Sequence, residues 1–163
     1  MAAEPQTLQP VVITATRTPQ PIDTVLADLR VIDAETIANA GPMTLTELLQ
    51  TRGGVEISAT GGPGQVSSIF LRGSNASHVV LLIDGVRVNS ATVGTNAFEN
   101  LPLAQIERIE ILRGVGSSLY GADAIGGVIQ VFTKQAGAER TEASVGAGRW
   151  GTREASVGLG RKL

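Results

Sequence analysis

The sequence predicts an α+β domain, in which a small mixed β-sheet is flanked by short helices and carries long glycine-rich loops on one face. Three observations predict it. Continuous apolar runs such as Val79–Ile83 are typical of buried strands, capping signals mark short helices, and 20 glycines punctuate the remaining segments. With 163 residues, 42% of them hydrophobic, the chain is expected to form one domain with a modest core.

Composition excludes several classes of function. A net charge of -2 indicates neither a nucleic-acid partner nor an anionic membrane surface. The chain has no cysteine, so disulfides and thiolate metal sites are excluded, and His78 as the single histidine is interpreted as a loop or packing residue. The start at Met1 shows no charged and apolar leader pattern, which indicates either a cytosolic chain or one whose signal peptide has been removed.

Residues 1–21 form the first predicted unit, a flexible N-terminal segment. Four prolines and the lack of an amphipathic period predict an extended, largely disordered chain. Within it, Val11–Thr16 is a strand-forming hexamer without a core of its own. Two interpretations stay open. The hexamer is either an edge strand of the domain or a peptide held out for a partner that binds it by strand addition.

Residues 22–135 form the predicted domain, and its first half contains the helices. The expected elements are a strand at 25–32, a helix at 34–39, a helix from 45 to the glycines at 53 and 54, and a strand at 55–57. Asp33 is placed to cap the first helix, because its carboxylate can accept from free N–H groups. Thr44 and Glu47 have the spacing of a capping box for the second helix.

The second half of this domain is organised around a hairpin. Val79–Ile83 is apolar throughout, which predicts a central strand covered on both faces, and Asp84-Gly85 suits a tight turn into a second strand. The stretch Gln65–Gly73 before it is placed in the same small sheet. The other expected elements are a helical turn at 101–106, strands at 108–112 and 128–133, and glycine-rich loops at 61–64, 90–100 and 113–127.

Residues 136–163 form a third unit built on an internal repeat. Glu142–Arg149 recurs as Glu154–Arg161 with alternating polarity around Trp150, the pattern of a hairpin in an outer-membrane barrel. Such strands need closure, because open edges cannot be satisfied in lipid. The sequence therefore predicts the first hairpin of a truncated barrel.

Catalytic motifs are absent from the sequence. Gly114 and Gly116 resemble the start of a dinucleotide loop, but Leu119 occupies the place of its third glycine. Neither Ser67 nor Ser118 lies in a nucleophile elbow, and no phosphate-binding loop occurs. We therefore predict no enzyme, no cofactor and no metal site.

Two arginines stand where apolar residues would be expected. Arg72 and Arg113 each end a strand and precede a glycine. Either both guanidinium groups reach solvent at the strand ends, or they pair with carboxylates on a surrounding structure outside this chain. A buried arginine requires such partners, and its planar fork suits carboxylates.

Taken together, these motifs resemble the plug domain of TonB-dependent outer-membrane receptors. The block from Gln65 to His78 is most similar to the cobalamin transporters of that family. The resemblance covers about Val11 to Lys134 and rests on Val11–Ala15, Gly61–Gln65, Ser67–Gly73, Asn75–Val79, Leu82–Arg87, Ile109–Gly114 and Tyr120–Ile129.

The resemblance implies a fold position and a set of partners. The domain would fill the lumen of its own 22-stranded barrel in the outer membrane of a Gram-negative bacterium, with a periplasmic N-terminus. The C-terminal domain of TonB would pair with a TonB box made of Val11, Val12, Ile13, Thr14 and Ala15. Arg72 and Arg113 would face barrel carboxylates. The ligand contacts carried over from cobalamin transporters are Val66, Ser68, Asn75, Val93 and Gly94.

The cargo and two alternative functions stay open. Cobalamin or another corrinoid is the first expectation, and a ferric siderophore is the alternative, since Gly94 replaces a serine of the cobalamin pattern. The first alternative function is a domain that binds a ligand by itself in the periplasm, and such a domain would need no barrel hairpin. The second is a nucleotide-dependent enzyme, whose thermal stability would rise when a nucleotide is added.

Overall fold

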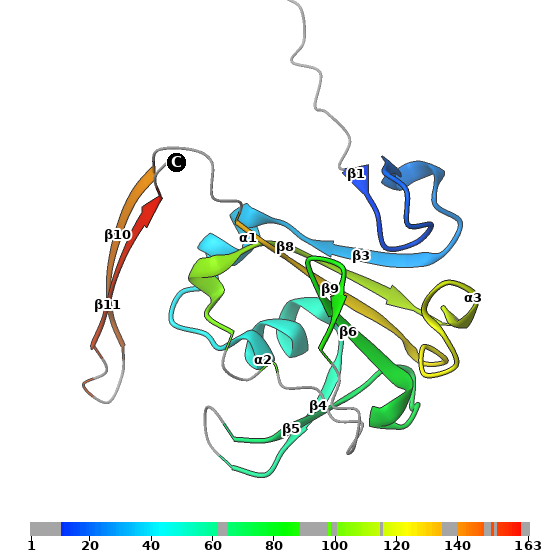
Figure 1. The fold of residues 1–163 in the computed structure, drawn as a ribbon. Helices are drawn as coiled ribbons and strands as arrows, with labels where there is room; N and C mark the ends of the chain where they lie inside the picture. The colour runs from blue at the N-terminus through cyan, green and yellow to red at the C-terminus, as the bar shows by residue number, and fades with distance from the viewer. Residues whose placement is uncertain are drawn as a thin grey trace, which may run out of the picture.

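A computed structural model places the chain around one five-stranded sheet (Figure 1). It describes residues 11–61, 65–88, 98, 101–114, 116–134, 140–148, 151 and 153–160. The strand order is β3 (Asp28–Ile32), β8 (Ile106–Arg113), β9 (Gly127–Thr133), β6 (Val79–Ile83) and β7 (Val86–Arg87). β6 and β9 run parallel, and the other neighbouring pairs are antiparallel. The predicted α+β fold with a small mixed sheet is confirmed.

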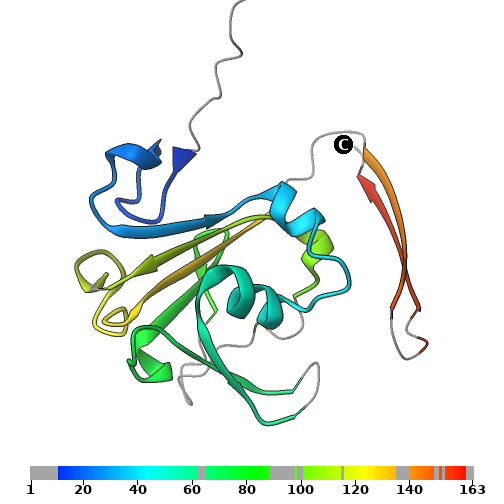
Figure 2. The same ribbon diagram turned by 180° about the vertical axis from the view of Figure 1, so that it is seen from behind.

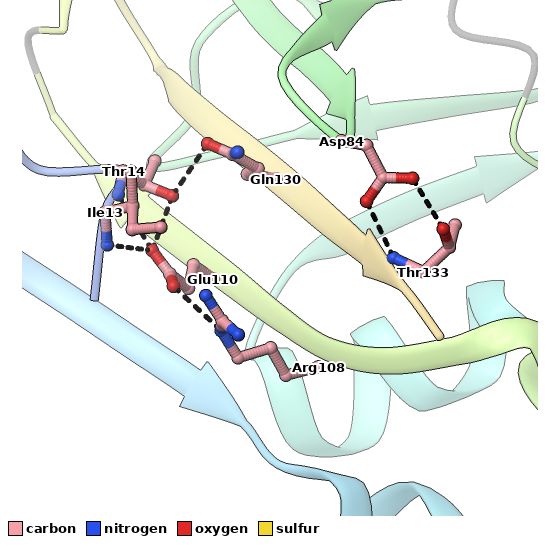
Figure 3. Close-up of polar contacts among 7 residues, drawn as sticks. All are labelled: Ile13, Thr14, Asp84, Arg108, Glu110, Gln130 and Thr133. Atoms are coloured by element: carbon pink, nitrogen blue, oxygen red, sulfur yellow. Dashed lines mark hydrogen bonds and ion pairs between the residues drawn. The ribbon is translucent and has the colours of Figure 1, made fainter. Parts of the chain in front are cut away.

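The predicted central hairpin is present between β6 and β7. Asp84 and Gly85 have φ angles of 48° and 82°, which the tight turn requires of both central residues. Asp84 also does more than turn the chain, because its Oδ1 accepts from the Thr133 amide at 2.8 Å and its Oδ2 from the Thr133 hydroxyl at 2.5 Å (Figure 3). The turn is thereby fastened to the end of β9.

Short helices cover one face of the sheet (Figure 2). The elements are α1 (Ala34–Ala38), α2 (Leu45–Leu48) and the π-helical turn η2 (Leu49–Gly53), with 3-10 turns η1 (Ile22–Thr24), η3 (Ala76–His78) and η4 (Leu103–Gln105) elsewhere. Both predicted caps are confirmed. Asp33 accepts from Thr36 N at 2.8 Å, and Thr44 and Glu47 make the reciprocal bonds of a capping box.

The main core lies between this helical layer and the sheet. Leu45, Leu48 and Leu49 are at most 2% exposed and pack against residues of β6, β8 and β9. Burying three leucines contributes about 1.5–3 kcal/mol each to folding relative to exposure. The helices are therefore held by their apolar faces, because helices of four or five residues are not stable alone.

The strand β5 (Ser67–Phe70) does not belong to the five-stranded sheet, in which the sequence pattern places it. β5 pairs with β4 (Glu56–Ala59) in a separate two-stranded sheet, so the placement of Gln65–Gly73 in the central sheet is wrong. β6 has both edges occupied, by β9 and β7. β5 instead pairs with the strand before it, which closes a short loop at little entropic cost.

The C-terminal hairpin is present as predicted. β10 (Arg140–Ala147) pairs with β11 (Arg153–Gly160) in antiparallel register, and both views show the two strands standing apart from the rest of the chain (Figures 1 and 2). Val145, Val157 and Leu159 lie on one face of this hairpin and are 73–88% exposed. Within the described ranges, no helix is long and apolar enough to cross a membrane.

Candidate functional site

The N-terminal segment lies against the second face of the sheet. β1 (Val11–Val12) pairs with β2 (Gln20–Pro21), and between them the chain turns back so that Arg17 N donates to the Ile13 carbonyl at 2.8 Å. Val12 and Thr14 are at most 1% exposed. The prediction of a disordered segment is therefore wrong for residues 11–21, and residues 1–10 lie outside the described part of the chain.

Neither interpretation of Val11–Thr16 describes the segment fully. It is not an edge strand of the five-stranded sheet, because β1 pairs with β2 alone. It is not held out either, because Thr14 is buried. Strand geometry ends at Val12, and the following residues form a turn that reaches Arg17, whose φ is 60°. The segment must unwind before all of it can pair as a strand.

A buried glutamate holds this turn in place (Figure 3). The Oε2 of Glu110 accepts from Ile13 N at 2.9 Å, from Thr14 N at 2.8 Å and from Thr14 Oγ1 at 2.7 Å. Its Oε1 accepts from Arg108 Nε at 3.1 Å. A carboxylate that is 0% exposed needs this many partners, since an uncompensated buried charge is strongly destabilising.

The sheet register explains why Glu110 faces the segment. Glu110 and Gln130 are cross-strand neighbours on β8 and β9, on the face opposite the helices, and Gln130 Oε1 lies 3.1 Å from Thr14 Oγ1. Around this polar pair lies a second apolar cluster, consisting of Val80, Leu82, Leu112, Ala124 and Val128, with Ala15, Leu29 and Tyr120 packed against it. The segment covers the polar end of this face.

Tyr120 makes a second set of contacts with the N-terminal segment. It ends α3 (Ser117–Tyr120), and its hydroxyl donates to the Thr14 carbonyl at 2.9 Å. The guanidinium of Arg17 lies 4.6 Å from the centre of its ring. Burial raises the pKa of the Tyr120 hydroxyl above its usual value.

The two arginines converge on a residue of the domain itself. Arg72 Nη2 lies 2.6 Å from Asp28 Oδ2, and Arg113 Nη1 lies 3.7 Å from Asp28 Oδ1. Arg113 also donates to the Gly53 carbonyl and its side chain is only 18% exposed, whereas that of Arg72 is 59% exposed. Neither this internal partner nor the difference in exposure between the two arginines follows from the sequence pattern.

The predicted ligand residues are only partly described. Val66 is 60% exposed just before β5, Ser68 is half-buried within β5, and Asn75 is exposed at the start of η3. β5 and η3 contact each other. Val93 and Gly94 lie outside the described residues. In the described part of the chain, no group of three or more acidic or histidine side chains is arranged to hold a metal.

Comparison with known protein families identifies the family of this domain. The TonB-dependent Receptor Plug Domain family matches residues 21–128, most of the chain. The chain belongs to this family. The predicted identity as a receptor plug is confirmed, and the family is one of receptors rather than enzymes.

Relatives of known name cover nearly all of the plug. It is 41% identical over 161 residues to the vitamin B12 transporter BtuB of Vibrio vulnificus strain CMCP6, and 40% identical over 160 residues to that of Vibrio cholerae strain M66-2. Each alignment covers 98% of this chain and 26% of the relative. The chain thus spans about a quarter of the length of these curated relatives.

Solved receptors share the fold. The ferric enterobactin receptor PfeA of Pseudomonas aeruginosa matches 72% of the chain and 19% of its own, with 32% identity and a TM-score of 0.54. The ferripyoverdine receptor from the outer membrane of the same species matches 91% of the chain and 19% of its own, with a TM-score of 0.73. At 21% identity the second likeness shows the fold alone.

Sequence reasoning missed the plug residues that hold the N-terminal segment. The sequence pattern places Glu110 only in an alternating strand and Tyr120 only in a glycine-rich loop. Glu110 stands between Ile109 and Ile111, which is the alternation of a strand with one face in solvent, so no local signal marks it as buried.

Proposed function

We propose that this plug gates a cobalamin-importing receptor in the outer membrane of a Gram-negative bacterium, and that residues 11–15 bind the C-terminal domain of TonB by strand addition. The observation that carries the coupling role is how residues 11–15 are attached. They are held by the side chains of Glu110 and Tyr120 and by a two-residue strand pair, outside the five-stranded sheet. The segment can leave without breaking that sheet.

Cobalamin is the proposed cargo because the curated relatives with about 40% identity are vitamin B12 transporters. The region of Val66, Ser68 and Asn75 would form the plug side of the ligand site, with Val93 and Gly94 completing it. A ferric siderophore is the second candidate. It is favoured by the likeness to the ferric enterobactin receptor, at 32% identity.

A barrel would complete the receptor beyond this chain. The hairpin β10–β11 presents Val145, Val157 and Leu159 on one exposed face, which suits the lipid side of a barrel's first strands. Arg72 keeps more than half of its side chain exposed while bound to Asp28. Because a guanidinium has five N–H donors, Arg72 can also pair with a barrel carboxylate. We assign the same partner class to Arg113.

The TonB interaction is tested by titrating the TonB C-terminal domain into this chain. Replacing Val12 with proline removes an N–H and its pairing geometry, and we expect binding to fall at least tenfold. Slow exchange of the Ile129 amide would show that the fold is kept. Leu26→Ala, which removes an exposed apolar side chain outside the segment, should bind as the parent does. Equal affinity of the Val12→Pro variant and the parent would reject the assignment.

The cargo is tested on the full-length receptor that contains this plug. We expect cobalamin to bind, and Ser68→Ala and Asn75→Ala each to weaken binding about tenfold through loss of a polar contact. Asn39→Ala, at the end of α1, is the control and should have no effect. Retention of a ferric siderophore without any cobalamin binding would reject the cargo and leave the coupling role intact.

A further inference from the structure

Thr14 is held through both of its main-chain groups. Its N–H donates to Glu110, and its carbonyl accepts from Tyr120 at 2.9 Å. In an antiparallel strand pair, a residue at a hydrogen-bonded position exchanges both of these groups with its partner. A protein that adds a strand with Thr14 at such a position must therefore displace both side chains. The plug and the added strand compete for the same atoms.

The loop that carries Tyr120 is fastened to the turn at 74–78. This crossover, residues 114–126, connects β8 to β9, and its Gly126 N donates to the His78 carbonyl at 2.9 Å. Within the crossover, Gly116 N donates to Ala124 O at 2.8 Å, and Tyr120 N donates to Gly116 O at 3.0 Å. Hydrogen bonds thus run from His78 to the residue that holds Thr14.

The crossover and the 74–78 turn are closely packed where they meet, and this contact contains the hydroxyl of Ser74. A Cβ on Gly126 would lie 2.1 Å from Ser74 Oγ, so the Ser74 side chain occupies the space that any larger residue at position 126 would need. The Ser74 hydroxyl is buried and has no hydrogen-bond partner among the described residues. A buried hydroxyl in this state is destabilising, and an alternative arrangement of the turn can relieve it.

We propose that Tyr120 is a positioning residue through which the 74–78 turn controls release of the N-terminal segment. A displacement of the turn moves the crossover through Gly126, and the Tyr120 hydroxyl then leaves Thr14. The inference rests on the proposed function, in which Asn75 in this turn contacts the cargo and residues 11–15 bind TonB. It adds the route between the two sites.

Amide hydrogen exchange in this chain tests the first half of the route. Tyr120→Phe keeps the ring and removes the hydroxyl. Loss of one hydrogen bond should accelerate exchange at Ile13 and Thr14 about five- to tenfold and leave Ile129 in β9 unchanged. Asp123→Asn is the matched control. It breaks the ion pair of the same crossover with Arg87 and does not touch Thr14. Unchanged exchange at Thr14 in Tyr120→Phe overturns the proposal.

A double-mutant cycle tests the second half. Gly126→Ala forces the crossover away from Ser74 and should accelerate Thr14 exchange as Tyr120→Phe does. In the Tyr120→Phe background it should add no further acceleration, because the contact that it acts on is already lost. Additive effects, or no effect of Gly126→Ala, would reject the route through Tyr120. If Gly126→Ala also lowers protection at Ile129, Ser74→Thr applies a smaller push at the same contact.

These readouts need neither TonB nor cargo, so the two proposals fail separately. If TonB does not bind the segment while exchange follows the expected pattern, the proposed function fails and the contact route stands. If TonB binds while neither Tyr120→Phe nor Gly126→Ala changes the exchange rate of the Thr14 amide, only the proposed route is wrong.

Discussion

At the scale of single residues, one buried carboxylate determines where the N-terminal segment lies. Glu110 is neutralised on one side by Arg108, whose guanidinium also lies 3.8 Å from the centre of the Phe132 ring. On the other side it accepts three hydrogen bonds from Ile13 and Thr14. Hydrogen bonds to a charged group contribute about 1.5–3 kcal/mol each, more than neutral ones. The segment is thus fixed by charge-assisted bonds as well as by packing.

Replacing Glu110 with glutamine should loosen the segment without unfolding the plug. The amide keeps the shape but loses the charge and one acceptor, so the bonds to Ile13 and Thr14 weaken. Removal of the buried charge itself offsets part of the cost to global stability. We expect trypsin to cleave after Arg17 roughly tenfold faster, with a melting temperature that changes by only a few degrees.

The control for this prediction lies on the same strand. Glu107→Gln removes an exposed carboxylate of β8 and should change neither cleavage nor melting temperature. Equal cleavage rates of Glu110→Gln and the parent would mean that packing of Val12, not Glu110, holds the segment.

At the scale of elements, the sequence predicts those features that depend on residues close together in the chain. The caps at Asp33 and Thr44 and the Asp84-Gly85 turn depend on residues at most three positions apart, and the repeat in β10–β11 on residues twelve apart. The structure has the two caps, the turn and the hairpin. The docked segment depends instead on Thr14 meeting Glu110, 96 positions along the chain. No local pattern contains that pairing, so the sequence alone predicts a disordered segment.

The same distinction explains β5 and the two arginines. The sequence predicts a strand within Gln65–Gly73, but it does not say which strand lies beside it. For Arg72 and Arg113, the sequence leaves open whether each side chain reaches solvent or pairs with a carboxylate, and only the fold brings Asp28 of β3 to them. Predicting the partners required the sheet order.

At the scale of the whole molecule, the sheet has two unequal faces. The helical face carries the main cluster, which includes Leu48, Ile69 and Ile111, while the other face carries a smaller cluster that Ala15 and Tyr120 complete. No residue of the described segment 11–21 belongs to the main cluster. The main cluster therefore forms without any contribution from the N-terminal segment, as detachment of that segment in the proposed function requires.

Deletion of residues 1–21 tests this division. The main cluster loses no member, so we expect cooperative unfolding to persist, with slow amide exchange still present in β9. The deletion uncovers Glu110 and the smaller cluster, which includes Leu82 and Leu112, so the shortened chain should also be less stable and self-associate at high concentration. Stability and cooperativity are measured by calorimetry, and exchange by the amides of β9. Deletion of residues 1–10 alone should change neither the stability nor the tendency to self-associate. Non-cooperative melting and fast exchange in β9 after removal of 1–21 would show that the segment is part of the folding core, in which case force applied to it would unfold the plug rather than detach one segment.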